Sequence, residues 1–220
     1  MNKTSIAACA RHFVDAACLV GSVALTSAPA LAHGGHDVAA MDHARHGAMA
    51  AVAGSADYKR SQRTYEAIPD VVLVDADARP VRLRALLADS GPVMLNFIFT
   101  TCTTICPVMS AVFADVRTRL GDESGNLRMV SISIDPENDT PAQLGAYAKK
   151  FGGDAHWTLL TGRAQDVAAV QRAFDSYDSD KMNHRPLTLL RAAPGRQWVR
   201  IDGFATADQL AGEYRSAMTP

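Results

Sequence analysis

Residues 93–107, VMLNFIFTTCTTICP, decide the fold of this chain. The run 93–99 is almost continuously apolar, which is typical of a strand buried on both faces of a sheet. Two cysteines follow, Cys102 and Cys106, and then a proline, a residue suited to the first turn of a helix. Apolar residues recur every four positions from there to residue 120, close to helical spacing. The stretch therefore predicts a central strand, a thiol-bearing loop and a helix over 107–120.

The segments around this stretch predict alternating strands and helices. Strands are expected at residues 71–74, 81–83, 127–134, 157–160, 187–190 and 198–201, and helices at residues 139–151, 165–174 and 207–218, with a helical turn near 86. The first two strands form an N-terminal hairpin, and the last two form a second hairpin. This order predicts an α/β, thioredoxin-like fold with a mixed central β-sheet flanked by helices. The thiol pair then lies at the end of the central strand, in the crevice where such sheets bind ligands.

The composition predicts a single globular domain with a tail, since the 220 residues are 48% hydrophobic and 20% charged. The formal net charge is −1, and no lysine- or arginine-rich run occurs. Because nucleic-acid binding needs concentrated positive charge, we expect no nucleic-acid partner.

The first 32 residues are typical of an export signal. Lys3 and Arg11 precede an apolar stretch at residues 16–25, and a small-residue cleavage site follows at residues 30–32. The apolar stretch is far shorter than the roughly 20 residues that cross a bilayer. We therefore expect cleavage after Ala32 and a periplasmic or other extracytoplasmic location, with membrane attachment only where this segment is retained as a tether.

Residues 33–62 are expected to form a flexible tail before a folded domain at residues 63–220, because small residues dominate and large aliphatic ones are few. The tail also carries imidazole and thioether groups, which are copper ligands. It is therefore a candidate secondary copper site, the alternative being a spacer with chance histidines. The candidate ligands are His33, His36, His43, His46, Met41 and Met49.

Removing residues 1–32 leaves Cys102 and Cys106 as the chain's two cysteines. In an oxidising compartment such a pair is a disulfide, a redox couple or a metal site. With a helix starting at Pro107, Cys106 would be the N-cap, where the helix dipole lowers a thiol pKa. Residues four apart on a helix have Cβ atoms about 5–6 Å apart, more than a disulfide prefers. The spacing therefore favours a shared metal over a disulfide.

Two thiolates and one imidazole form a three-coordinate site that can hold Cu(I) or Cu(II), whereas zinc favours four ligands or an open catalytic position. Two histidines lie in the predicted domain. His156 sits in a glycine-rich stretch and is read as an exposed loop residue. His184 enters a strand that should face the thiol loop, and it is the better third ligand, although a solvated loop histidine is the simpler alternative.

These segments resemble the Sco/SenC family of copper-binding, cytochrome c oxidase assembly proteins. The resemblance rests on residues 99–107 and 131–141, on residues 157–162 and on the late histidine, and it spans roughly residues 68–214. It implies a copper chaperone that binds copper through Cys102, Cys106 and His184. It also implies a copper-acceptor protein as partner, namely cytochrome c oxidase subunit II with its dinuclear copper centre.

Other functions of the thiol pair compete with copper delivery. Family members usually have aspartate before the histidine, whereas Asn183 precedes it here. Pro186 stands where thioredoxins place a cis-proline facing their cysteines, which favours a thiol-disulfide oxidoreductase that reduces a copper acceptor. Thr103 suggests a peroxiredoxin-like peroxidase, but this sequence has no arginine near the thiols to activate peroxide. A structural disulfide closing so short a loop would stabilise the fold by only about 2 kcal/mol.

Overall fold

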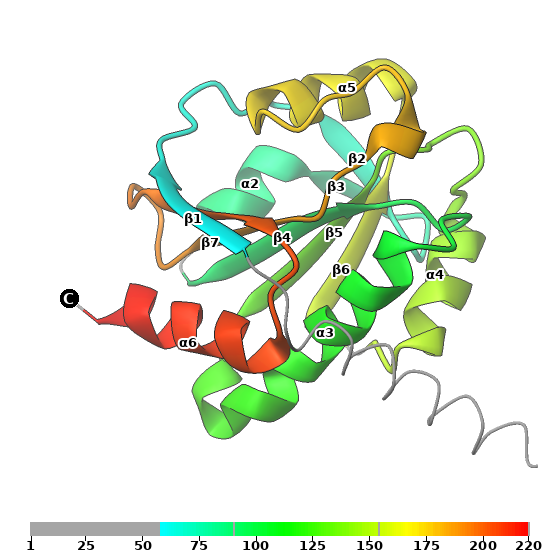
Figure 1. Cartoon of the computed structure of the whole chain (residues 1–220). Coiled ribbons are helices and arrows are strands. Elements are labelled where there is room, and N and C mark those ends of the chain that lie inside the picture. The colour runs from blue at the N-terminus through cyan, green and yellow to red at the C-terminus, as the bar shows by residue number, and fades with distance from the viewer. Residues whose placement is uncertain (1–57, 90, 154, 220) are drawn as a thin grey trace, which may run out of the picture. The chain divides into compact units, whose positions relative to one another are not determined.

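The computed structural model describes residues 58–89, 91–153 and 155–219. Its centre is strand β4 (Val93–Ile98), whose six residues are all buried (Figure 1). β4 pairs in parallel with β5 (Arg128–Ser133) and antiparallel with β7 (Leu187–Arg191). The apolar run is therefore covered on both faces and bordered on both edges, as the sequence predicts.

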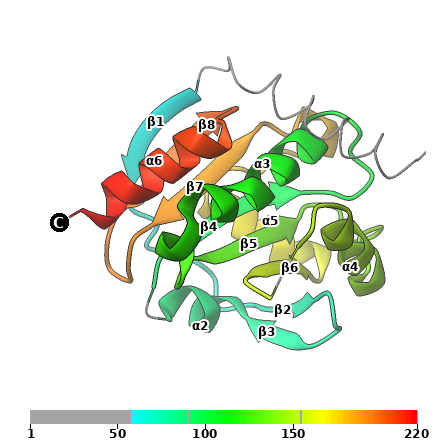
Figure 2. The same cartoon turned by 90° about the horizontal axis from the view of Figure 1, so that it is seen from below.

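Eight strands form one mixed sheet in the order β1-β8-β7-β4-β5-β6-β2-β3, seen from below in Figure 2. The remaining strands are β1 (Tyr58–Arg63), β2 (Val72–Asp75), β3 (Pro80–Arg82), β6 (Trp157–Thr161) and β8 (Trp198–Gly203). β4, β5 and β6 run parallel, and the other pairs are antiparallel, including the predicted β2–β3 and β7–β8 hairpins. The predicted thioredoxin-like, α/β architecture is confirmed.

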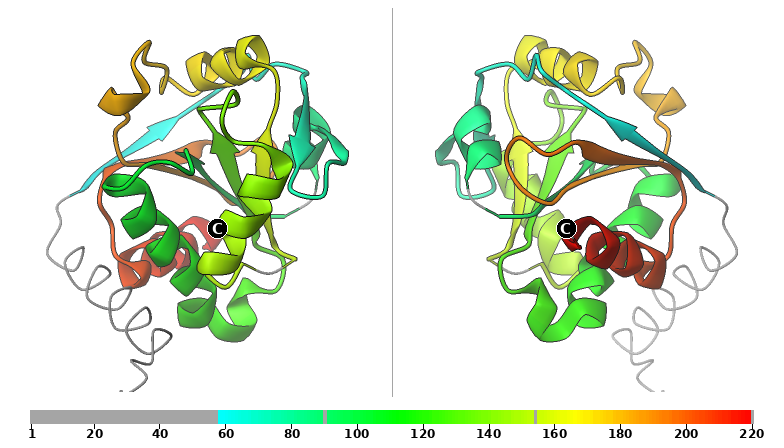
Figure 3. Two further views of the ribbon diagram at one scale, coloured as in Figure 1. Left: turned by 90° about the vertical axis from the view of Figure 1, so that its right-hand side faces the viewer. Right: turned by 90° about the vertical axis from the view of Figure 1, so that its left-hand side faces the viewer.

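Helices cover both faces of the sheet (Figures 1 and 3). One apolar core lies under α3 (Ile105–Leu120), α4 (Pro141–Lys150) and α6 (Ala207–Met218). A second core lies under α2 (Leu83–Ala88) and α5 (Ala164–Ala173) on the opposite face. The described residues also include two short 3-10 helices, η2 (Gly121–Ser124) and η3 (Lys181–Asn183). Among the described residues, no helix has the length and hydropathy needed to cross a membrane.

Local capping explains where two of these helices begin. Thr140 precedes Pro141 and forms a capping box with Gln143, in which each side chain bonds the other residue's backbone N–H. Thr206 and Gln209 form the same arrangement at the start of α6. These caps satisfy backbone donors that would otherwise lack partners at a helix start.

Two predicted boundaries are wrong. Residues 58–62, assigned to the tail, lie in strand β1, which pairs with β8. Two hydrogen bonds also join β1 to α6: the Tyr58 hydroxyl lies 2.9 Å and the Arg60 guanidinium 2.8 Å from the carboxylate oxygens of Glu213. The polar composition of this edge strand hides it from a hydrophobic pattern. Helix α3 begins at Ile105 instead of at Pro107. The predicted export signal and the rest of the tail fall outside the described residues.

Candidate metal centre

The thiol loop, residues 99–104, joins the carboxyl end of β4 to the start of α3. The Cys102 N–H donates to the Phe99 carbonyl at 3.2 Å, which turns the chain sharply after the strand. This turn brings the first cysteine back over the first turn of α3, where the second cysteine lies. The loop thereby places both sulfur atoms at the end of the central strand.

Both cysteines are reduced, and they differ in exposure. The Cys106 N–H donates to Cys102 Sγ at 3.3 Å, and the Thr104 hydroxyl lies 3.8 Å from the same sulfur. Cys102 keeps 8% of its surface exposed, whereas Cys106 is fully buried. Cys102 is therefore the outer thiol, and it receives the hydrogen bonds that stabilise a thiolate.

The pKa values of the two thiols move in opposite directions. Burial by itself would raise the pKa of Cys102, but hydrogen bonds from Cys106 and Thr104 outweigh burial and hold it below the usual thiol value. Burial raises the pKa of Cys106, and the hydrogen bond and charge of Cys102 raise it further. The expectation of an N-terminal thiolate at Cys106 is therefore wrong, because Thr104 is the N-cap and Cys106 lies inside the first turn.

The thiol loop is held by a buried carboxylate, Asp139, whose role the sequence analysis does not predict. Asp139, fully buried before α4, accepts the Thr100 N–H at 3.1 Å and the Thr100 hydroxyl at 2.5 Å. It also accepts the Ser133 hydroxyl at 2.6 Å. In the sequence, Asp139 is interpreted as part of a helix start, which gives no sign of this role. The signal that could have indicated it is Ser133, which interrupts the apolar pattern at the end of β5.

His184 follows η3 and lies three residues before β7, on the side of the sheet end that faces the thiol loop. Its Nε2 is 2.9 Å from the Phe97 carbonyl oxygen, and its ring is 6.4 Å from the Phe99 ring. Because a carbonyl can only accept, Nε2 carries the proton and Nδ1 keeps the free lone pair. Burial lowers the pKa of His184, opposed by the bond to Phe97, so the imidazole is neutral near pH 7.

The structure groups the predicted ligands only in part. Cys102 and Cys106 lie together, but within the described part of residues 58–219 no three His, Cys, Asp or Glu side chains are close enough to share a metal ion. His184 bonds a backbone carbonyl instead. His156 is exposed and its carbonyl bonds Met129 at the start of β5, far along the strand from the thiols.

Two further predictions concern the tail ligands and Pro186. The candidate secondary ligands of the tail fall outside the described residues. The described chain has no cis peptide bond, so the bond before Pro186 is trans and the cis-proline expected from thioredoxins is not formed. Thiol exchange therefore gains no support from a cis-proline.

Comparison with known proteins gives concordant matches. A family model described as SCO1/SenC matches residues 59–219. A Bacillus subtilis protein described as an SCO1 protein homolog is 40% identical over 155 residues, covering 65% of this chain and 78% of the relative.

Two solved structures extend the likeness to the fold. BsSco, described as a member of the Sco family of cytochrome c oxidase assembly proteins with a disulfide switch, is 27% identical, with a TM-score of 0.58 over 69% of this chain and 93% of that one. Copper-bound ScoI of Arabidopsis thaliana is 26% identical, with a TM-score of 0.58 over 69% and 98%. By its family model, its relatives and its fold, the chain belongs to the SCO1/SenC family.

Proposed function

We propose that this chain is an extracytoplasmic copper chaperone that binds copper through Cys102, Cys106 and His184. One observation carries the proposal, namely that the buried, free thiols of Cys102 and Cys106 lie together, with the Cys106 backbone N–H 3.3 Å from Cys102 Sγ. Soft thiolates favour Cu(I), and a neutral imidazole on the facing loop supplies a third donor. The copper-bound relative supports the same cargo.

The acceptor follows from the family rather than from a feature of this chain. We infer that copper passes to the copper centre of cytochrome c oxidase subunit II, since the family relative BsSco is described as a cytochrome c oxidase assembly protein. Export through residues 1–32 would place chaperone and acceptor in one compartment. The histidines and methionines of the tail, with their soft and borderline donors, would act as a looser secondary copper site.

Anaerobic Cu(I) titration against a chromophoric chelator tests the ligand set. Residues 33–220 are used with the four tail histidines, Met41 and Met49 replaced by alanine, so that the secondary site is silent. Cys102→Ser and His184→Ala should each weaken Cu(I) binding by at least ~10-fold, the size of effect known even for groups outside the ligand shell. His156→Ala is the matched control and should change nothing. Unchanged affinity and stoichiometry in both ligand variants would contradict the proposal.

Thiol-disulfide exchange is a second candidate, favoured by the asymmetry of the pair. An outer thiol of lowered pKa beside a buried partner fits an attacking and a resolving cysteine. With a model disulfide, Cys106→Ser should form a stable mixed disulfide at Cys102, whereas Cys102→Ser should react at least ~10-fold more slowly, since each pKa unit changes the thiolate fraction tenfold. Equal rates in the two variants, or no exchange, would remove this candidate.

A further inference from the structure

The segment that carries His184 is anchored firmly at its base. This segment, residues 175–184, is called the His184 loop. At its base, Arg200 donates to the Phe174 carbonyl at 2.7 Å and to the Asp175 carbonyl at 3.4 Å. The Ser176 N–H donates to the Gln171 carbonyl at 2.9 Å. These bonds fix where the loop leaves α5.

The far end of the loop reaches two other segments: the His184 ring lies against the Phe97 carbonyl of β4, and an ion pair joins Lys181 to the segment after β5. Lys181 Nζ lies 2.5 Å from Asp135 Oδ2, although the residues are 46 positions apart. Asp135 is buried just after β5 and is held in place by the Asn138 amide, 3.0 Å from both carboxylate oxygens. The carboxylate is thus a rigid partner, and the lysine is the mobile one.

The same ammonium group also faces the thiol loop. Lys181 Nζ lies 5.7 Å from the centre of the Phe99 ring, within cation–π range. Phe99 in turn contacts the His184 ring edge and holds the Cys102 N–H through its carbonyl. The His184 N–H donates to the Lys181 carbonyl at 3.1 Å. One lysine therefore connects the end of β5, the thiol loop and the histidine.

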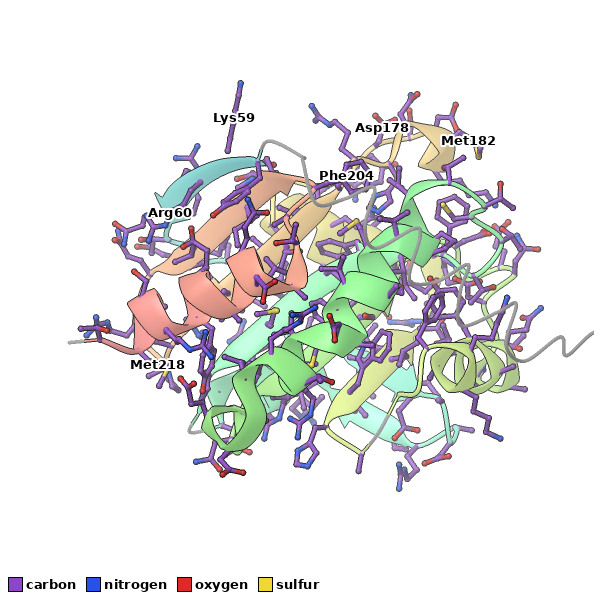
Figure 4. The ribbon with its side chains drawn as sticks, turned by 60° about the horizontal axis from the view of Figure 1, so that its bottom comes forward. Lys59, Arg60, Asp178, Met182, Phe204 and Met218 are labelled. Atoms are coloured by element: carbon purple, nitrogen blue, oxygen red, sulfur yellow. The ribbon has the colours of Figure 1, made fainter. Side chains whose placement is uncertain are left out.

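A cavity lies beside the His184 loop. It has a volume of about 570 Å³ and lies between this loop, α5 and the segment after β5, and both Asp135 and Lys181 line it. At the tip of the loop, Met182 is 72% exposed and projects outward (Figure 4). With space on one side and solvent on the other, the loop tip depends on polar anchors for its position.

We propose that Lys181 and Asp135 are positioning residues whose ion pair holds the His184 loop against the thiol loop, so that the imidazole meets copper on a loop that is already ordered. The inference rests on the proposed copper function. An ordered loop avoids the entropy cost of immobilisation when the metal binds. Loss of the pair should therefore weaken copper binding about 10-fold, as loss of groups that orient metal ligands does.

The metal-free full chain gives the first test, independent of copper. Lys181→Met keeps the side-chain length and removes the charge, and Lys181→Arg keeps the pair. Backbone hydrogen exchange at Met182 and His184, whose N–H groups bond Asp180 Oδ1 and the Lys181 carbonyl, should speed up about 10-fold in Lys181→Met and not in Lys181→Arg. Unchanged exchange in Lys181→Met would overturn the proposal.

Arg128→Met is the matched control, because it breaks an ion pair of the same 2.5 Å length, with Asp89. The Arg128–Asp89 pair lies at the opposite end of β5 from Asp135. The rise per residue of a strand puts the two ion pairs about 20 Å apart. A general loss of stability would affect both variants, whereas loss of the anchor affects Lys181→Met alone. Equal exchange at residues 182 and 184 in both variants would overturn the proposal.

Copper binding gives the second test. Lys181→Met should bind Cu(I) about 10-fold more weakly than the parent at unchanged stoichiometry, and the nitrogen hyperfine signal of its Cu(II) form should weaken, with Lys181→Arg restoring both. Faster exchange with unchanged copper binding, while His184→Ala does weaken binding, would overturn the positioning role alone. Unchanged binding in His184→Ala would instead remove His184 from the proposed ligand set, and the positioning role with it.

Discussion

The two halves of the candidate site differ in how they are held. The thiol loop lies on buried groups: Asp139 bonds Thr100 twice, and the sulfur of Cys102 bonds the first turn of α3. The His184 loop borders a cavity, and its far end is held by the ion pair to Asp135 and by the bond from His184 to the Phe97 carbonyl. A fixed pair of sulfur atoms and an imidazole on a less packed loop would suit the proposed copper chaperone, which would both hold a metal ion and release it.

The difference also assigns separate tasks to the two halves. In the fixed half, burial and hydrogen bonds decide which sulfur has the lower pKa. In the other half, the neutral ring is held on the Phe97 carbonyl, and under the proposed function it would have to approach the thiols to share a metal with them. The first half would then supply the two sulfur donors, and the second would supply the imidazole.

The largest expected effect comes from removing the support of the fixed half. Asp139→Ala leaves the Thr100 backbone N–H and the buried Ser133 hydroxyl without their acceptor. An unpaired buried donor costs about 1–3 kcal/mol, so the free energy of unfolding should fall by about 3 kcal/mol. Urea unfolding of the reduced, metal-free protein followed by circular dichroism measures this change.

Asp77→Ala is the control for that experiment. Asp77 is an exposed aspartate paired with Arg79 at 2.5 Å, and pairs of this kind contribute about 0–1 kcal/mol. The thiol loop should keep its geometry in this variant. A loss of stability in Asp139→Ala no larger than that in Asp77→Ala would show that the carboxylate does not hold the loop.

A smaller effect is expected from the half that carries His184, as a dependence of stability on pH. The folded pKa of His184 lies below the ordinary imidazole value of about 6.5. Below that value the unfolded chain binds the proton first, so the free energy of unfolding should fall as pH drops from about 6.5 toward the folded pKa. Urea unfolding of the metal-free chain at a series of pH values measures the slope.

The same series in His184→Gln identifies the group that causes the slope. A glutamine side chain cannot titrate, so the dependence below about pH 6.5 should flatten in this variant. An identical slope in the parent and in His184→Gln would place the titrating group elsewhere and would contradict the half-buried, neutral state of this ring.

Much of the fold could be predicted because its signals are local. The apolar run of β4, the capping threonine before α4 and the hairpin β7–β8 each lie within a short stretch of chain. Strand β1 was missed because an edge strand with lysine and arginine lacks that pattern. Its place depends on pairing with β8, more than 130 residues away in the chain.

The site could be predicted only as a set of donors. Sequence alone specified the alternation of strands and helices, the two cysteines at the end of the central strand and the candidate histidine, since side-chain period and motif spacing are local properties. Chain folding then decided that Cys102 is the more acidic thiol, that Asp139 supports its loop and that Lys181 pairs the histidine segment with Asp135. These features depend on burial and on contacts 39 and 46 residues apart, which exist only once distant parts of the chain have packed together.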